Sequence, residues 1–74
     1  PNAFKAHNNL AVILANRGDL IGATEHLREA VRLEPDVPEV HTELADVLER
    51  QGQHAEAQRQ LAQARRLQAV GTAH

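Results

Sequence analysis

The sequence predicts an all-α fold of two tandem antiparallel helix-turn-helix repeats, a fragment of an α-α superhelix or solenoid. Three observations lead to this prediction. Alanine and leucine dominate the apolar residues, which make up 42% of the 74-residue chain, and Phe4 is the only aromatic residue; this composition favours closely packed helices over a sheet. Apolar residues recur at the i, i+3, i+4, i+7 spacing of helices. The same pattern of residues returns after 34 positions.

The 34-residue period is visible when "HNNLAVILANRG" is written above "HTELADVLERQG". Self-similarity at one fixed offset is the signature of a repeat array. The identical pairs are His7 and His41, Leu10 and Leu44, Ala11 and Ala45, Leu14 and Leu48, Gly18 and Gly52, Ala23 and Ala57, Leu27 and Leu61, Ala30 and Ala64, Arg32 and Arg66, and Leu33 and Leu67.

The first copy predicts helices over 3–16 and 20–33. Lys5 is the only charged residue of the first helix, which is unusual for a helix that faces water. Asp19 is placed to cap the second helix. The apolar stripe of that helix consists of Ala23, Leu27, Ala30 and Leu33.

The second copy predicts helices over 37–51 and 54–69. The prolines of "EPDVPEV" end the preceding helix, and Asp36 and Glu39 suit an acidic variant of the capping box for the next. Gly52 stands where a helix commonly ends on a left-handed residue. The buried stripe of the third helix is Val40, His41, Leu44, Ala45, Val47 and Leu48, and that of the fourth is Ala57, Leu61, Ala64 and Leu67.

The period and its anchor residues resemble the tetratricopeptide repeat family. The family pattern runs large-x2-Leu-small-x2-aromatic, then Ala-x3-aromatic, then Pro. Histidine or leucine stands here where the family favours an aromatic residue. The matching positions are His7, Leu10, Ala11, Leu14, Ala23, Leu27 and Pro35 in the first copy, and His41, Leu44, Ala45, Leu48, Ala57 and Leu61 in the second. The resemblance covers nearly the whole chain, which we expect to be one domain, 1–74, with repeats at about 4–37 and 38–71.

The first helix lacks a charged face, so we expect another surface to cover it. Two repeats also fall short of the three or so that an array needs for stability. The cover is either further repeats upstream, since the chain opens on Pro1 and is expected to be a fragment or processed product, or a second copy of the chain. We therefore predict a homo-oligomer with a self-association edge at Phe4, Val12 and Ile13. Domain swapping through "EPDVP" is one route to such an oligomer.

The flank of the fourth helix is polar, because His54, Ala55 and Arg65 stand where the second helix has Leu20, Ile21 and Val31. This pattern predicts a terminal repeat that faces water.

Several classes of function are excluded or disfavoured. The net charge of −2 argues against nucleic acid as a partner, and no apolar run is long enough to span a membrane. Serine, cysteine and tyrosine are absent, so we expect neither an enzyme nor a cofactor. We expect no metal, since no two histidines have the i, i+4 spacing that places two imidazoles on one ion. His7 and His41 are instead expected to pack within the repeats. The lack of cysteine is compatible with cytoplasm or periplasm, and we favour the cytoplasm.

The resemblance implies a concave groove, lined by the first helix of each repeat, that takes an extended peptide or a partner helix. Residues 36–49 hold five acids and no lysine or arginine, so we expect a neutral or basic partner in preference to an acidic tail. Lys5 with Asn8 or Asn9 offers cations and amides for a carboxylate, but the neighbouring acids would repel it. Groove positions lie opposite the buried stripes: Lys5, Asn8, Val12, Ala15 and Asn16, then Glu39, Thr42, Glu43, Asp46, Glu49 and Arg50.

The resulting hypothesis is a non-catalytic protein-interaction scaffold that binds a peptide or partner helix in this groove. One alternative is a structural segment that stacks or swaps into an oligomer or continues a longer repeat array. Another is an accessory arm that positions substrate for an enzyme in the same parent protein. The interaction-scaffold and structural-segment hypotheses differ in what covers residues 3–16 and in whether the groove of 37–51 stays free.

Overall fold

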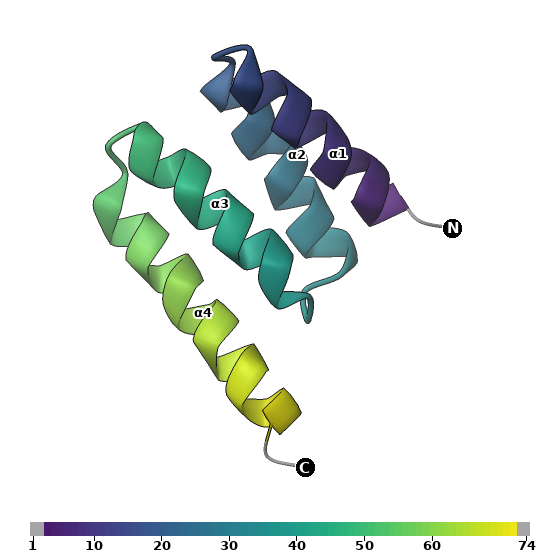
Figure 1. Ribbon diagram of the computed structural model, residues 1–74, viewed down its shortest axis with the longest axis vertical. Helices are drawn as coiled ribbons and strands as arrows, with labels where there is room; N and C mark the ends of the chain where they lie inside the picture. The colour runs from purple at the N-terminus through teal and green to yellow at the C-terminus, as the bar shows by residue number, and fades with distance from the viewer. Residues whose placement is uncertain (1–2, 73–74) are drawn as a thin grey trace.

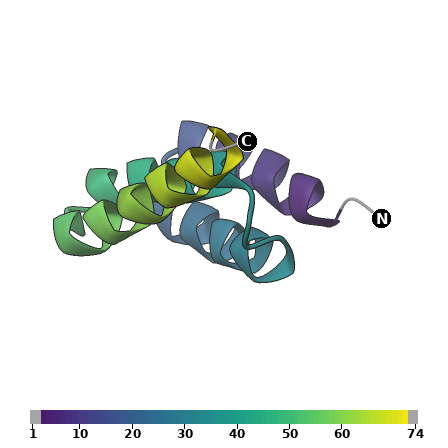
Figure 2. The same cartoon turned by 90° about the horizontal axis from the view of Figure 1, so that it is seen from below.

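The computed structural model describes residues 3–72, which form four helices and no strand. The helices are α1 (Ala3–Asn16), α2 (Leu20–Leu33), α3 (Pro38–Arg50) and α4 (His54–Thr72). α1 packs against α2, α3 packs against α4, and α3 also contacts α2, so that two antiparallel hairpins lie side by side (Figure 1). The molecule is a thin slab, 39 × 32 × 16 Å (Figure 2). The predicted all-α fold of two helical repeats is confirmed.

The turn between α1 and α2 joins the end of one helix to the start of the next. Gly18 has φ +87°, a left-handed conformation that suits glycine. The Asp19 N–H donates to the Leu14 carbonyl at 2.8 Å, and the Gly18 N–H donates to the Ala15 carbonyl at 3.0 Å. The Asp19 side chain then accepts from the Gly22 N–H at 2.9 Å. The predicted cap of α2 is therefore confirmed.

The start of α3 differs from the prediction. Asp36 and Glu39 do not form a capping box, because the helix begins one residue later than that box requires. Val37 is the N-cap in an extended conformation, and no side chain caps this end. Pro38 occupies the first helical position, where its missing N–H leaves one fewer donor to satisfy.

The end of α3 repeats the arrangement at the end of α1. Gly52 has φ +80°, and the Gln53 N–H donates to the Leu48 carbonyl at 2.8 Å. The predicted helix stop at Gly52 is confirmed. α4 continues three residues beyond the predicted end at 69. Ala69 stands 34 positions after Pro35, and alanine, unlike proline, permits the helix to continue.

The core consists of the alanine and leucine stripes of the facing helices. All six residues predicted for the stripe of α3 are buried. The alanines Ala23 and Ala57 have no exposed surface, so the paired helices approach closely at these positions. Leu33, Leu61 and Leu67 of the predicted stripes are only partly buried. The remaining buried apolar residues are Ala11, Leu27, Ala30 and Ala64.

Two polar side chains are buried with their hydrogen bonds satisfied. His41 contacts the side-chain amide of Gln60 through Nδ1 and the Pro35 carbonyl through Nε2, both at 2.8 Å. Its burial fits the packing role predicted for it. Thr24 donates to the Leu20 carbonyl at 2.8 Å and accepts from Gln51 Nε2 at 2.6 Å, which links α2 to the end of α3.

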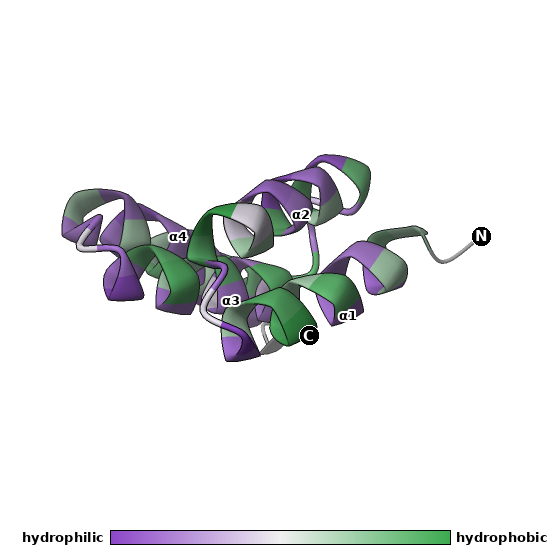
Figure 3. Cartoon of the chain, turned by 90° about the horizontal axis from the view of Figure 1, so that it is seen from above, coloured by the Kyte–Doolittle hydropathy of each residue, from purple (hydrophilic) through white to green (hydrophobic). Residues whose placement is uncertain are grey.

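α1 leaves several of its apolar side chains exposed to water. Only Ala11 of this helix is buried, whereas Leu10, Val12 and Ile13 are exposed. Colouring by hydropathy shows the apolar middle of α1 beside the more polar outer surface of α2 (Figure 3). In the part of the chain from 3 to 72, no helix is long and apolar enough to cross a membrane.

Candidate partner-binding groove

A hollow of about 90 Å³ lies between α1 and α3. Small side chains create it, because Ala11 and Ala15 let the backbone of α1 form one wall without filling the space beside it. Val47 contributes from α3 and Leu27 from α2. We call this hollow the groove; its full lining is Ala11, Val12, Ala15, Asn16, Leu27, Glu43, Asp46, Val47 and Arg50.

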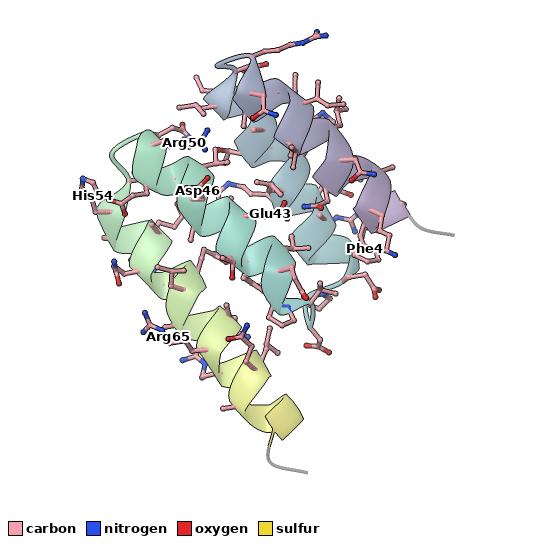
Figure 4. All side chains as sticks on the ribbon, in the orientation of Figure 1. Phe4, Glu43, Asp46, Arg50, His54 and Arg65 are labelled. Carbon is pink, nitrogen blue, oxygen red and sulfur yellow. The ribbon has the colours of Figure 1, made fainter. Side chains whose placement is uncertain are left out.

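The rim of the groove on α3 is charged. Glu43, Asp46 and Arg50 follow one another at helical spacing (Figure 4), which places them on one face of α3. Arg50 Nη2 lies 3.2 Å from Asp46 Oδ2. Asn8 Nδ2 donates to Glu43 Oε2 and so joins α1 to α3 across one end of the groove. The rim therefore carries two carboxylates against one guanidinium.

The structure brings together about half of the residues predicted for the groove. Asn8 bonds to its rim. Thr42 and Glu49 instead line, with Asp46, a second hollow between α3 and α4. Lys5 and Glu39 are exposed and line neither hollow. Of the predicted groove residues, those that line the groove are Val12, Ala15, Asn16, Glu43, Asp46 and Arg50.

The apolar wall of the groove was not predicted. Ala11, Leu27 and Val47 belong to buried stripes, and their edges also face the space between the helices. Spacing along one helix assigns a residue to a face, but it does not show where two faces meet and leave a gap.

The three residues predicted for a self-association edge have different surroundings. Phe4 is partly buried against the core. Val12 lines the groove. Ile13 lies on the exposed side of α1, together with Leu10, which is an anchor position of the repeat pattern. Self-association through these residues stays a prediction.

Comparison with known families supports the repeat assignment. The family model described as Tetratricopeptide repeat matches residues 14–70. The chain is a tetratricopeptide repeat protein. No curated protein matches it. Tetratricopeptide repeats generally act as protein–protein interaction modules and are typically non-enzymatic scaffolds.

This tetratricopeptide repeat protein also contains a histidine pair that the sequence did not predict. His7 Nδ1 and His26 Nδ1 lie 2.9 Å apart, so one imidazole donates to the other. The ring planes are inclined by 29°. Residues 7 and 26 come from different helices, and a search for two histidines one turn apart cannot find such a pair. No group of three or more His, Asp or Glu side chains within residues 3–72 is arranged to hold a metal ion.

An ion pair joins the two outer helices of the tetratricopeptide repeats. Arg28 on α2 donates to both carboxylate oxygens of Glu56 on α4, at 2.6 and 3.0 Å. The hydrogen bonds that Arg28 donates lower the pKa of Glu56, and the same bonds raise the pKa of Arg28. This contact supplements the apolar packing between the hairpins.

Replacing Glu56 by glutamine is expected to lower the free energy of unfolding by less than about 1 kcal/mol at neutral pH, because both partners of the ion pair remain in contact with water. The pKa of Glu56 is lower in the folded than in the unfolded protein. Its contribution is therefore present above the ordinary glutamate pKa of about 4.3 and is lost as the pH falls through the lower folded value.

Urea unfolding at a series of pH values measures this effect. The difference between the wild type and Glu56→Gln should shrink on acidification. Glu25→Gln, which removes an exposed carboxylate from α2, is the control and should change little. A difference that grows as the pH falls would contradict the assignment of the pair.

Proposed function

We propose that this chain is a non-catalytic interaction module whose groove binds a neutral or basic segment of a partner protein. The observation that carries the proposal is the juxtaposition of an apolar wall, formed by Ala11, Leu27 and Val47, with the carboxylates of Glu43 and Asp46. Such a surface suits a peptide that presents an aliphatic side chain beside a lysine or arginine.

The size of the groove favours a peptide over a small molecule. Sites for small molecules typically enclose roughly 300–1,000 Å³, whereas this hollow measures about 90 Å³. A volume of this size suits one short apolar side chain. The rest of the partner would lie along the outer surfaces of α1 and α3, either as an extended chain or as a helix.

The charge of the rim selects the partner. Arg50 is paired with Asp46 and Asn8 with Glu43, so that an incoming cation would compete with or join these existing contacts. An acidic tail would have only Arg50 on this rim to bind and would be repelled by both carboxylates. We therefore infer a preference for basic over acidic segments, with most of the effect at low ionic strength.

Fluorescence anisotropy tests this function with two labelled peptides that share a central leucine and differ only in lysine or glutamate at the flanking positions. We expect the basic peptide to bind at least about tenfold more tightly, a difference of about 1.4 kcal/mol. The double reversal Glu43→Lys with Asp46→Lys should remove this preference.

The matched control reverses charge away from the groove. Glu25→Lys, on the exposed surface of α2, should leave the preference nearly unchanged. Equal binding of the two peptides by the wild type, or an unaltered preference in the double reversal, would disprove the proposed function.

A second candidate function is self-assembly, and the exposure of α1 favours it. The exposed fractions of Leu10 and Ile13 are 40% and 49%, whereas their counterparts 34 positions later, Leu44 and Val47, are 1% and 4% exposed. Burying these exposed apolar side chains against another protein surface would stabilise the chain. Light scattering should then report a mass above the 8.1 kDa of the monomer.

A further inference from the structure

The uncovered side of α1 corresponds to the side of α3 that packs on the first hairpin. Both helices pair with the following helix of their own hairpin, but within residues 3–72 only α3 has another hairpin on its other side. Residues buried in α3 and exposed in α1 are therefore those that the neighbouring hairpin covers. Val40, Leu44 and Val47 meet this criterion, since their counterparts are the exposed Ala6, Leu10 and Ile13. We call Ala6, Leu10 and Ile13 the leading edge.

The second hollow is the counterpart, 34 positions later, of the surface of the first hairpin on which α3 packs. On the first hairpin this surface includes Ala11, Val12, Ala15 and Leu27. The residues 34 positions later line a hollow of about 280 Å³ between α3 and α4 (the trailing hollow). The full lining of the trailing hollow is Thr42, Ala45, Asp46, Glu49 and Leu61.

Burial shows that this corresponding surface is uncovered. Leu27 is fully buried where α3 lies over the first hairpin, whereas Leu61 is only partly buried. The chain thus presents both halves of a contact whose internal example is already formed between its two hairpins.

We infer that two copies of this chain associate head to tail, with the leading edge of one copy in the trailing hollow of the next. This inference goes beyond the groove function and specifies the faces used in the self-assembly alternative. The occupant of the trailing hollow is α1 of a second copy, placed as α3 is placed on the first hairpin.

The polar contacts of the internal example have compatible counterparts in this arrangement. The bond from Asn8 to Glu43 corresponds to a contact between Thr42 and Asn9 of the second copy. Charge does not oppose the contact, because α1 carries no acidic side chain that Asp46 and Glu49 of the trailing hollow would repel.

The contact between copies should be weaker than the internal one. α4 carries His54, Gln58 and Arg65 where α2 carries Leu20, Thr24 and Val31, so less apolar surface is buried around Leu61. Because the contact joins two different surfaces, it leaves one free leading edge and one free hollow, and association can continue beyond the dimer.

Complementary variants test the inference by sedimentation or light scattering from micromolar to millimolar concentration. The edge variant carries Leu10→Asp with Ile13→Asp, and the hollow variant carries Leu61→Asp. We expect the mass of the wild type to rise beyond the dimer with concentration, and each variant alone to remain a monomer. An equimolar mixture should form a dimer and stop there. The intact edge of the hollow variant binds the intact hollow of the edge variant, and the dimer then presents only the two mutated surfaces.

The outcomes separate head-to-tail contact from other arrangements. A symmetric contact of α1 with α1 predicts that the hollow variant dimerises alone and that the mixture forms no mixed dimer. That result would overturn the inference, and so would a wild type that stays monomeric at millimolar concentration.

Two further variants guard against misfolding and nonspecific effects. Thr42→Arg obstructs the hollow from an exposed position and is used if Leu61→Asp loses helical circular dichroism. Ile21→Asp changes an exposed apolar residue outside both surfaces and should still associate. Peptide binding by the edge variant reports on the groove function separately.

Discussion

Replacing Leu44 by alanine is expected to remove most of the stability of the fold. Leu44 is fully buried between the hairpins, and truncation of a buried leucine costs about 2–5 kcal/mol. A single core in a chain of this size supplies only about 3–5 kcal/mol. Urea unfolding followed by helical circular dichroism should therefore show a variant that is largely unfolded without denaturant or has a much lower midpoint.

The matched control is the same truncation 34 positions earlier. Leu10 keeps 40% of its surface exposed, so Leu10→Ala leaves little cavity and should lower the free energy of unfolding by less than about 1 kcal/mol at concentrations where the protein is monomeric. Equal losses at the two positions would show that the two helices have equivalent surroundings, against the structure.

Replacing Ala57 by leucine should have the second-largest effect. The Cβ of Ala57 has no exposed surface, and α3 and α4 approach each other at this residue. Three additional carbon atoms must push the helices apart or adopt strained rotamers, at a typical cost of about 1–3 kcal/mol. Thermal unfolding should show a clear fall in Tm, since 1 kcal/mol corresponds to roughly 4–8 °C for a domain of this size.

Ala55→Leu provides the comparison for this substitution. Ala55 lies on the exposed side of the same helix, so the same change in volume should alter the free energy of unfolding by no more than about 0.5 kcal/mol. If Ala57→Leu were equally harmless, the alanine contacts would not determine the distance between the helices.

The helices could be predicted from the sequence because the signals that define them are local. Gly18 and Gly52 stop helices by their own conformational freedom, and Asp19 bonds to an amide three residues away. The start of α3 was mispredicted because two local signals compete there. Proline at the first helical position set the boundary, and the acidic residues around it do not cap the helix.

The groove could be predicted only in part, because it depends on how the helices are placed against each other. Glu43 and Asp46 were found from the pattern of α3 alone. The contact of His7 with His26 and that of Gln51 with Thr24 join residues far apart in sequence. No spacing within one helix indicates which residue of a neighbouring helix lies opposite, so these contacts required the structure.

The turn at Asp19 also bears on how the chain reaches its fold. One residue ends α1 through its backbone N–H and starts α2 through its carboxylate, so the reversal of direction is encoded within a few positions. Most contacts then form between near neighbours along the chain, within a hairpin or between successive hairpins. Chains with such short-range connectivity fold to their native arrangement in about microseconds to milliseconds, which leaves little time for the alanine and leucine stripes to aggregate before the hairpins bury them.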